Sequence, residues 1–315
     1  MKVIKKKTVC TLFALMLALM LAIGCDTTND DNDNGDNNNN SSDSSNNGGN
    51  ISDYLTIENG VLTKCSANAS GNIAIPDSVT SIGKFAFVGC TSLTSVTIPD
   101  SVTSIGNSAF CESLEKIQYK GTLAQWCEID NDYSLGFCAK SIILSDGTDL
   151  KAETELIIPD GVTSIGNNAF WRFTSLTSVT IPDGVTSIGQ WAFYNCTGLT
   201  SVTIGNGVTS IGDWAFDGCE LLTSITIPDS VTSIGEGAFY DCTSLTRVTI
   251  PDSVTSIDSG AFWNCTSLES VNYNGSEGEW YKIKLLRNNY NGYGTGLNGK
   301  TIIGKDGETW IHTGN

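Results

Sequence analysis

The sequence has little of what most enzyme active sites require. It contains one histidine, His312, three residues from the end of the chain. We expect a terminal histidine to be too mobile to act as an oriented general base. The sequence also lacks a phosphate loop, an HExxH pair and a Gly-x-Ser-x-Gly elbow. The remaining acids lie at repeated turn positions or in a polar tract, so we predict a protein that is not an enzyme and needs no cofactor.

Basic residues are also scarce: 17 Lys and Arg stand against 34 Asp and Glu. The first 24 residues hold four of the lysines and no acid, so the rest of the chain has a net charge of −21. A surface this acidic disfavours nucleic acid and anionic lipid headgroups as partners. Charged residues make up only 16% of the chain, while Thr, Ser, Asn and Gly are abundant, which favours a polar, β-rich exterior.

The start of the chain is typical of a secretory signal, because a basic stretch precedes an apolar run from Val9 to Ile23. The alternative, a transmembrane helix, needs a longer run and a charge cluster after it. The ending Ala22-Ile23-Gly24-Cys25 resembles the cleavage box of bacterial lipoproteins, although Ala22 stands where that box usually has Leu. The resemblance implies cleavage before Cys25 and lipidation of its thiol, which would anchor the protein to the membrane. An ordinary secreted protein cut nearby is the alternative.

Residues 26–50 contain no apolar side chain, so they cannot offset the entropy of ordering and are expected to form a flexible tether. Within them, Asp30-x-Asn32-x-Asn34-Gly35 matches the opening of a calcium loop, but Ser41 replaces the closing Glu. Chance matches of this kind are expected in an Asn/Asp tract.

A repeated unit dominates the rest of the chain. It reads IPDSVTSIGKFAFVGCTSLTSVT at residues 75–97 and recurs from Ile98, Ile158, Ile181, Ile204, Ile227 and Ile250, the last five at a period of 23 residues. Val and Ile alternate with Thr, which predicts a half-buried strand. Pro-Asp predicts a turn, Val-x-x-Ile-Gly a second extended piece, and Ala-Phe-x-x-Cys a short helical turn. One unit cannot close a core, so the units must stack.

The Leu-x-x-Val-x-Ile-Pro strand, the Val-x-x-Ile-Gly step and the Ala-Phe-x-x-Cys turn resemble the BspA-like leucine-rich repeats of bacterial surface antigens, over about residues 51–315. The resemblance implies a β-rich α/β solenoid with parallel strands on the concave face and short helical turns on the convex face. It also implies a role in adhesion or interaction at the bacterial surface.

A second, sparser repeat ends each run of units: Tyr119-x-Gly121-Thr122 with Trp126 matches Tyr273-x-Gly275-Ser276 with Trp280. The family carries such inserts. We therefore predict these segments: 1–24 signal peptide, 25–50 lipid-anchored linker, 51–74 N-terminal cap, 75–118 first repeat block, 119–157 insert or cap module, 158–272 second repeat block, and 273–315 C-terminal cap.

Cysteines recur at one repeat position, and Phe173 replaces them in one unit, which indicates a buried apolar site. The cysteines are Cys90, Cys196, Cys219, Cys242 and Cys265. We expect buried thiols that behave as small hydrophobes, because their side chains point in parallel and no histidine lies nearby to complete a metal site. Cys127 and Cys138 are the best candidates for a disulfide, and their pairing stays open.

The outward residues of the long strands form the candidate binding face. They are Thr94, Ser95, Thr97, Thr177, Ser178, Thr180, Thr200, Ser201, Thr203, Thr223, Ser224, Thr226, Thr246, Arg247 and Thr249. Solenoids bind ligands across extended faces of this kind. The alternative is β-propensity and solubility alone, since threonine is a good exposed strand residue. Arg247 is the one charge in these rows.

Two further sets of repeated residues, aspartates and tryptophans, each allow a functional and a structural interpretation. The aspartates that follow the prolines either cap turns or hold cations, and we favour turns. They are Asp77, Asp100, Asp160, Asp183, Asp229 and Asp252. The tryptophans beside the Ala-Phe turns either pack against the core or form stacking platforms for sugars, and we favour packing. They are Trp171, Trp191, Trp214 and Trp263.

We predict an exported protein that is lipid-anchored to the cell envelope on its outer surface and mediates adhesion or protein–protein interaction. Its partner would be a protein or glycan at the cell surface, with no nucleic acid. A periplasmic scaffold lipoprotein and a carbohydrate-binding surface protein are the alternatives.

Overall fold

The computed structural model describes residues 54–110, 113–131, 139–285 and 294–313, all within one compact unit, Gly48–Asn315. The predicted signal peptide, the lipidation site Cys25, the linker and Cys138 lie outside the described residues.

One side of each coil is a strand with alternating burial, and these strands together form what we call the long-strand face. Its strands are β3 (Ser70–Ala74), β5 (Ser92–Ile98), β7 (Lys116–Tyr119), β9 (Ser141–Ile143), β10 (Glu155–Ile157), β12 (Ser178–Ile181), β14 (Ser201–Ile204), β16 (Ser224–Thr226), β18 (Arg247–Ile250), β20 (Ser270–Tyr273), β22 (Thr301–Ile303) and β23 (Thr309–Ile311). They form three sheets, β3-β5-β7-β9, β10-β12-β14 and β16-β18-β20-β22-β23.

A second side carries very short strands and is called the Ser-Ile face. Its strands are β1 (Leu55–Glu58), β2 (Val61–Cys65), β4 (Ser81–Ile82), β6 (Ser104–Ile105), β8 (Asp130–Asn131), β11 (Ser164–Ile165), β13 (Ser187–Ile188), β15 (Ser210–Ile211), β17 (Ser233–Ile234), β19 (Ser256–Ile257) and β21 (Lys284–Leu285). Pairing on both faces is parallel except in two hairpins, β1–β2 and β22–β23. The segment predicted as the N-terminal cap contains the hairpin β1–β2, which turns at Asn59 and Gly60, both with positive φ.

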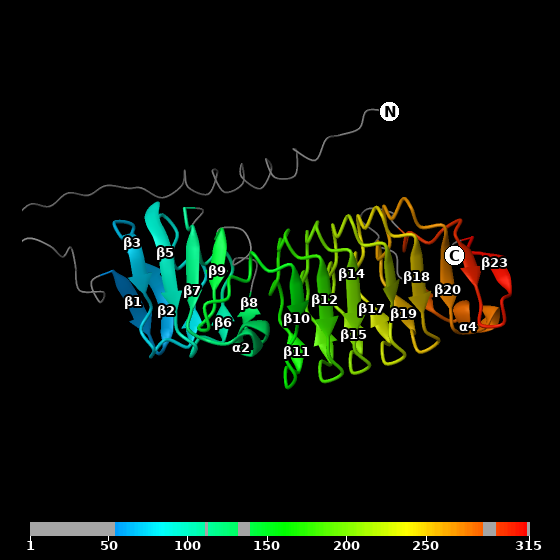
Figure 1. The fold of residues 1–315 in the computed structure, drawn as a ribbon, viewed down its shortest axis with the longest axis horizontal. Helices are drawn as coiled ribbons and strands as arrows, with labels where there is room; N and C mark the ends of the chain where they lie inside the picture. The colour runs from blue at the N-terminus through cyan, green and yellow to red at the C-terminus, as the bar shows by residue number, and fades with distance from the viewer. Residues whose placement is uncertain (1–53, 111–112, 132–138, 286–293, 314–315) are drawn as a thin grey trace, which may run out of the picture. The chain divides into compact units, whose positions relative to one another are not determined.

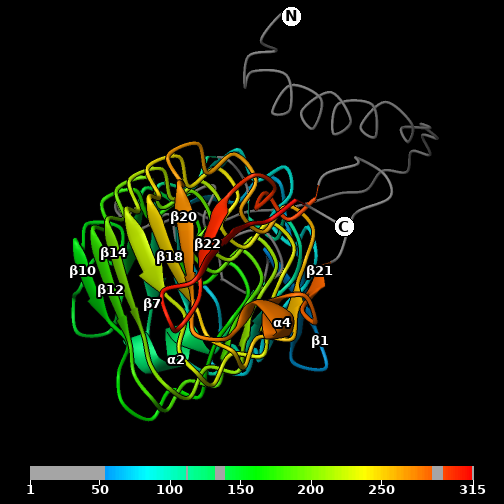
Figure 2. The same ribbon diagram turned by 90° about the vertical axis from the view of Figure 1, so that its right-hand side faces the viewer.

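The strands pair so that equivalent residues of successive units lie side by side. Val179 pairs with Val202 on the long-strand face, and Ile188 pairs with Ile211 on the Ser-Ile face. Figure 1 shows β10, β12 and β14 following one another along the stack, and Figure 2 looks along it so that the coils overlap. The chain is therefore a solenoid of parallel strands with little helix.

The core is a set of ladders that run along this stack. Phe170, Phe193, Phe216, Phe239 and Phe262 are all buried. Neighbouring rings in this ladder have centroids 5.2–5.4 Å apart and planes within 10° of parallel. Each ring covers the next, so no single coil has to enclose its own core.

The Ala-Phe segments differ from the predicted short helical turns. Trp191 and Asn195, which flank one such segment, have φ of 53° and 54°, and a right-handed helix excludes such values. The N–H groups of Trp191, Phe193 and Asn195 instead donate to carbonyls of the next coil, at 2.7–3.0 Å. The alternate N–H groups close tight turns within the coil. We call this third side the turn face, and its ladder satisfies backbone groups that a helix would pair internally.

The structure describes two helices, and both belong to the modules that end the repeat runs. They are α2 (Leu123–Cys127) and α4 (Glu277–Trp280). Both begin with a capping box, Thr122 with Gln125 and Ser276 with Glu279. Across the described ranges, no helix has the length and apolar character needed to cross a membrane.

The Tyr-x-Gly…Trp motif of these modules is a packing motif. The rings of Tyr119 and Trp126 meet edge to face at 5.6 Å, and a side chain at Gly121 would lie 2.5 Å from the Tyr119 ring. The Trp126 indole N–H donates to the Ala169 carbonyl at 3.0 Å, so the first module is joined to the repeat block that follows it.

In the second module the equivalent tryptophan finds a different acceptor. The Trp280 indole N–H donates to Nδ1 of His312 at 3.4 Å, and the His312 side chain is buried. The expectation of a mobile His312 is therefore wrong, because the β22–β23 hairpin carries this residue back over the end of the solenoid. The His312 ring provides the acceptor that the Ala169 carbonyl of the next coil provides in the first module.

The repeat cysteines are buried, as predicted, and they also donate hydrogen bonds. Cys219 Sγ lies 3.4 Å from the Phe193 carbonyl of the preceding coil, and Cys242 Sγ lies 3.3 Å from that of Phe216. Burial raises the pKa of Cys196 to about 12, so such a thiol keeps its proton at neutral pH and can donate it. Cys127 is a buried free thiol.

Candidate interaction surface

The structure places the candidate binding residues on the outer side of the long-strand face. In β12, Val179 and Ile181 point into the core while Ser178 and Thr180 point outward. All fifteen candidate residues are exposed or half-exposed, and none is buried. They form three parallel rows, with Thr177, Ser178 and Thr180 as one member of each row.

The row that contains Thr177 has a structural task. Most of its hydroxyls donate to carbonyls of the preceding coil: Thr177 to Thr154 at 2.8 Å, Thr200 to Thr177 at 3.0 Å and Thr246 to Thr223 at 3.0 Å. These side chains tie successive coils together, so their hydroxyls can only accept hydrogen bonds from a ligand. Thr94 does the same in the first block, with the Gly71 carbonyl at 3.1 Å.

The hydroxyls of the other two rows do not bond to the neighbouring coils that the structure describes. Ser178 and Ser201 pair in register, as do Thr180 and Thr203. Throughout the described part of the chain, the hydroxyls of these rows have no hydrogen-bond partner within the protein. Each hydroxyl can both donate and accept, so the two rows present a regular polar surface that is already ordered before a ligand arrives.

Arg247 interrupts the serine row. It lies in register between Ser224 of β16 and Ser270 of β20, and its side chain is exposed. A guanidinium offers five N–H donors in a fixed geometry. It is thus the position at which the repetitive rows carry a directional, charged group.

The long-strand face also exposes apolar groups that sequence reasoning missed. Ile157 begins the third row, opposite Thr180, and is 69% exposed; Leu221, just before β16, is 51% exposed. The sequence did mark Leu221 as unusual, because every other unit has Ser or Gly at that position. Exposed apolar side chains beside ordered polar rows are common in protein interfaces.

Leu221 lies beside a break in the hydrogen-bonded sheet, since β14 and β16 belong to different sheets. The coil of β14 has Gly205-Asn206-Gly207 where most units have a proline turn. A Cβ atom at Gly207 would lie only 1.9 Å from the Asp183 carbonyl of the preceding coil. This coil therefore lies closer to its predecessor than a side chain would permit.

The proline-linked aspartates lie in exposed turns. In one of them the Val185 N–H closes the turn on the Pro182 carbonyl at 3.2 Å. The Asp183 carboxylate accepts the N–H of Asn206 in the next coil at 2.7 Å, and Asp77 pairs with Lys120 at 2.8 Å. Among the residues that the structure describes, no group of three His, Cys, Asp or Glu side chains could hold a metal ion.

The four tryptophans lie on the turn face, and three of them pack against neighbouring aromatic rings. Trp171 is buried and its ring lies 4.3 Å from that of Tyr194. Trp214 is half-buried and lies 5.6 Å from Tyr240. Packing therefore accounts for Trp171, Trp191 and Trp214, while the half-buried Trp263 lines a cavity.

Comparison with solved structures finds leucine-rich-repeat proteins of bacteria. A leucine-rich cell surface protein of Faecalibacterium prausnitzii is 24% identical, with a TM-score of 0.43, covering 71% of this chain and 93% of that one. The pneumococcal vaccine antigen PcpA is 18% identical, with a TM-score of 0.45, covering 70% and 75%. A leucine-rich-repeat protein of Bacteroides ovatus is 24% identical, with a TM-score of 0.38, covering 71% and 70%. A search of curated proteins finds no match to the chain.

The family model for the BspA type leucine-rich repeat region matches six copies, over residues 53–132 and 151–280. These ranges span more than half of the chain and include both repeat blocks. Membership suggests protein–protein interaction or adhesion as the general role, since proteins of this family are generally binding proteins and not enzymes. The chain belongs to the BspA-type leucine-rich-repeat family.

Proposed function

We propose that this chain is an exported, lipid-anchored protein of the outer cell surface that binds a protein partner through the long-strand face. The observation that carries the proposal is the pair of outward rows whose hydroxyls are not used within the solenoid, with Ile157 and Leu221 exposed on the same face. The lipoprotein-like box at Cys25 and the polar tract after it support display at a distance from a membrane.

A protein suits this face better than a small molecule does. The rows extend over several coils, whereas small-molecule sites are usually concave pockets. Arginine is among the residues that most often anchor protein interfaces, and the buried centre of an interface is richer in apolar side chains than its rim. Ile157, Leu221 and Arg247 provide such anchors, and the two hydroxyl rows provide polar contacts between them.

The test introduces two charges into the third row, as Thr203→Lys with Thr226→Lys. Beads coated with the purified protein are counted after washing on host-cell monolayers and on layers of neighbouring bacteria. We expect native beads to be retained on at least one of these and the variant to lose about tenfold or more, because a buried, unpaired charge costs well over 1.4 kcal/mol at an interface.

The matched control is Thr209→Lys with Thr232→Lys on the Ser-Ile face of the same two coils. These threonines are also exposed, and each donates its hydroxyl to the preceding coil, so the control loses more internal bonding than the test variant. Equal retention of native and test-variant beads, or equal loss in both variants, would contradict binding through the long-strand face.

A further inference from the structure

A cavity of about 300 Å³ lies where the last repeat coil meets the C-terminal cap. The cap accepts only some of the hydrogen bonds that a further coil would accept on the turn face. Gly260 N–H donates to the Gly294 carbonyl at 3.0 Å and Phe262 N–H to the Thr295 carbonyl at 2.8 Å. Beyond Phe262 the cap leaves the path that a further coil would follow. The cavity opens at this departure.

Because the cap leaves this path, one backbone N–H of the last repeat coil has no acceptor among the described residues. In the preceding coils the residue before the repeat cysteine donates its N–H to the next coil: Asn195 to Asp217 at 2.7 Å, Gly218 to Tyr240 at 2.8 Å and Asp241 to Trp263 at 3.0 Å. Asn264 holds the same position, and within the described ranges its N–H has no acceptor. A ligand in the cavity can supply one.

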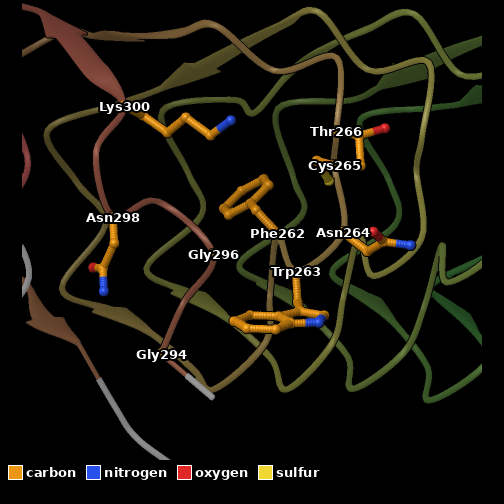
Figure 3. Close-up of a pocket in the computed structure, with 9 residues that line it drawn as sticks. All are labelled: Phe262, Trp263, Asn264, Cys265, Thr266, Gly294, Gly296, Asn298 and Lys300. Atoms are coloured by element: carbon orange, nitrogen blue, oxygen red, sulfur yellow. The ribbon is translucent and has the colours of Figure 1, made fainter. Parts of the chain in front are cut away.

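The lining has an apolar floor and a polar rim. Phe262 and Cys265 are buried beneath the cavity, and Trp263 presents a half-buried indole beside it. Figure 3 shows Asn264 and Thr266 on the repeat coil at one side of the cavity, and Asn298 and Lys300 on the cap at the other. The Thr266 hydroxyl donates to the Thr243 carbonyl of the preceding coil at 3.4 Å. The Asn264 amide donates to Asp241 at 2.6 Å, which leaves its second N–H and its oxygen available.

Lys300 is the charged residue of this lining. Its Nζ donates to the Leu268 carbonyl, which uses one of three N–H donors and holds the ammonium at the cavity. A cation in a cavity with amide donors favours a ligand that carries a carboxylate, and the formal net charge of −17 favours a ligand with no more than one negative charge. The same overall charge disfavours a nucleotide with several phosphates.

We propose that this cavity binds one pyranose ring of an acidic glycan. Its volume is at the low end of the roughly 300–1,000 Å³ of small-molecule sites, which suits a single ring. A pyranose has C–H groups that pack on an indole face and a rim of hydroxyls that match amides. Lys300 pairs with the carboxylate of a uronic acid. The site lies away from the long-strand face, so its failure and that of the proposed protein interface are distinguishable.

The test is saturation-transfer NMR on the purified full chain with glucuronate, galacturonate, glucose and galactose. We expect transfer to the uronates, with dissociation constants on the order of millimolar for so small a ligand, and weaker transfer to the neutral sugars. Trp263→Ala should abolish the signal. Lys300→Met should reduce uronate binding to the level of the neutral sugars.

The sharpest variant is Asn264→Gly, because Asn264 has φ of 58° and glycine occupies the equivalent position at Gly218 with φ of 71°. The change removes the amide and keeps the backbone, and we expect about tenfold weaker binding. Asn195→Gly, at the same position in an earlier coil, should leave binding unchanged. No transfer to any of the four sugars, or transfer that survives Trp263→Ala and Asn264→Gly, would overturn the proposal.

Discussion

Replacing Phe216 with alanine is expected to lower the free energy of unfolding by about 3–5 kcal/mol. The Phe216 ring is fully buried and lies between those of Phe193 and Phe239, with centroids 5.2 and 5.4 Å away. Removing this ring leaves a cavity, and neither Phe193 nor Phe239 can fill it without losing its stacking on the next ring of the ladder. Denaturant-induced unfolding, followed by circular dichroism, measures the effect.

The control for this prediction is Tyr281→Ala, since Tyr281 is 46% exposed and should change stability by no more than about 0.5 kcal/mol. Phe216→Leu keeps most of the buried volume and should lie between the two. A loss below about 1 kcal/mol for Phe216→Ala would mean that the aromatic ladder does not hold the coils together.

Deleting one complete coil, residues 227–249, is expected to leave a folded, shorter solenoid. Successive coils contact each other through equivalent residues, with hydrogen-bonded partners 23 positions apart, so Phe216 would stack on Phe262 as it now stacks on Phe239. Stability in such arrays is a sum of coil and nearest-neighbour terms. The unfolding transition should therefore stay cooperative, with a loss limited to one coil and one interface.

Deleting only the first half of that coil, residues 227–238, is expected to abolish the cooperative transition of the region after it. This shorter deletion puts strand residues opposite turn residues and turns inward-facing positions outward. Circular dichroism and limited proteolysis separate the two variants. Equal damage from both deletions would show that the coils are not interchangeable units.

The sequence predicted the inward and outward pattern of the coils well, because burial follows a simple alternation. Val179 and Thr180 could be assigned to opposite sides from their spacing alone, and Phe173 in place of a cysteine correctly marked that position as buried. The helical turns were predicted from the Ala-Phe-x-x-Cys spacing, which carries no information on the sign of the backbone φ angles. The signal was the residue before each cysteine, Gly89, Asn195, Gly218, Asp241 or Asn264, types that tolerate positive φ.

Other features could not be predicted from the repeat. His312 looked terminal and mobile because its partner, Trp280, is distant in sequence and the hairpin that joins them lies outside the repeat pattern. The hydroxyl bonds of Thr177 and Thr200 depend on the offset between coils, which identical letters do not reveal. The cavity at Trp263 arises where the cap departs from the coil path, so the repeat itself carries no sign of it.

Display of the solenoid outside the cell as an interaction module is tested by treating intact cells with a non-permeant protease and blotting for the solenoid. We expect loss of the full-length protein while a periplasmic control stays intact. Survival in intact cells, with loss only after lysis, would contradict it and would favour a scaffold role within the envelope.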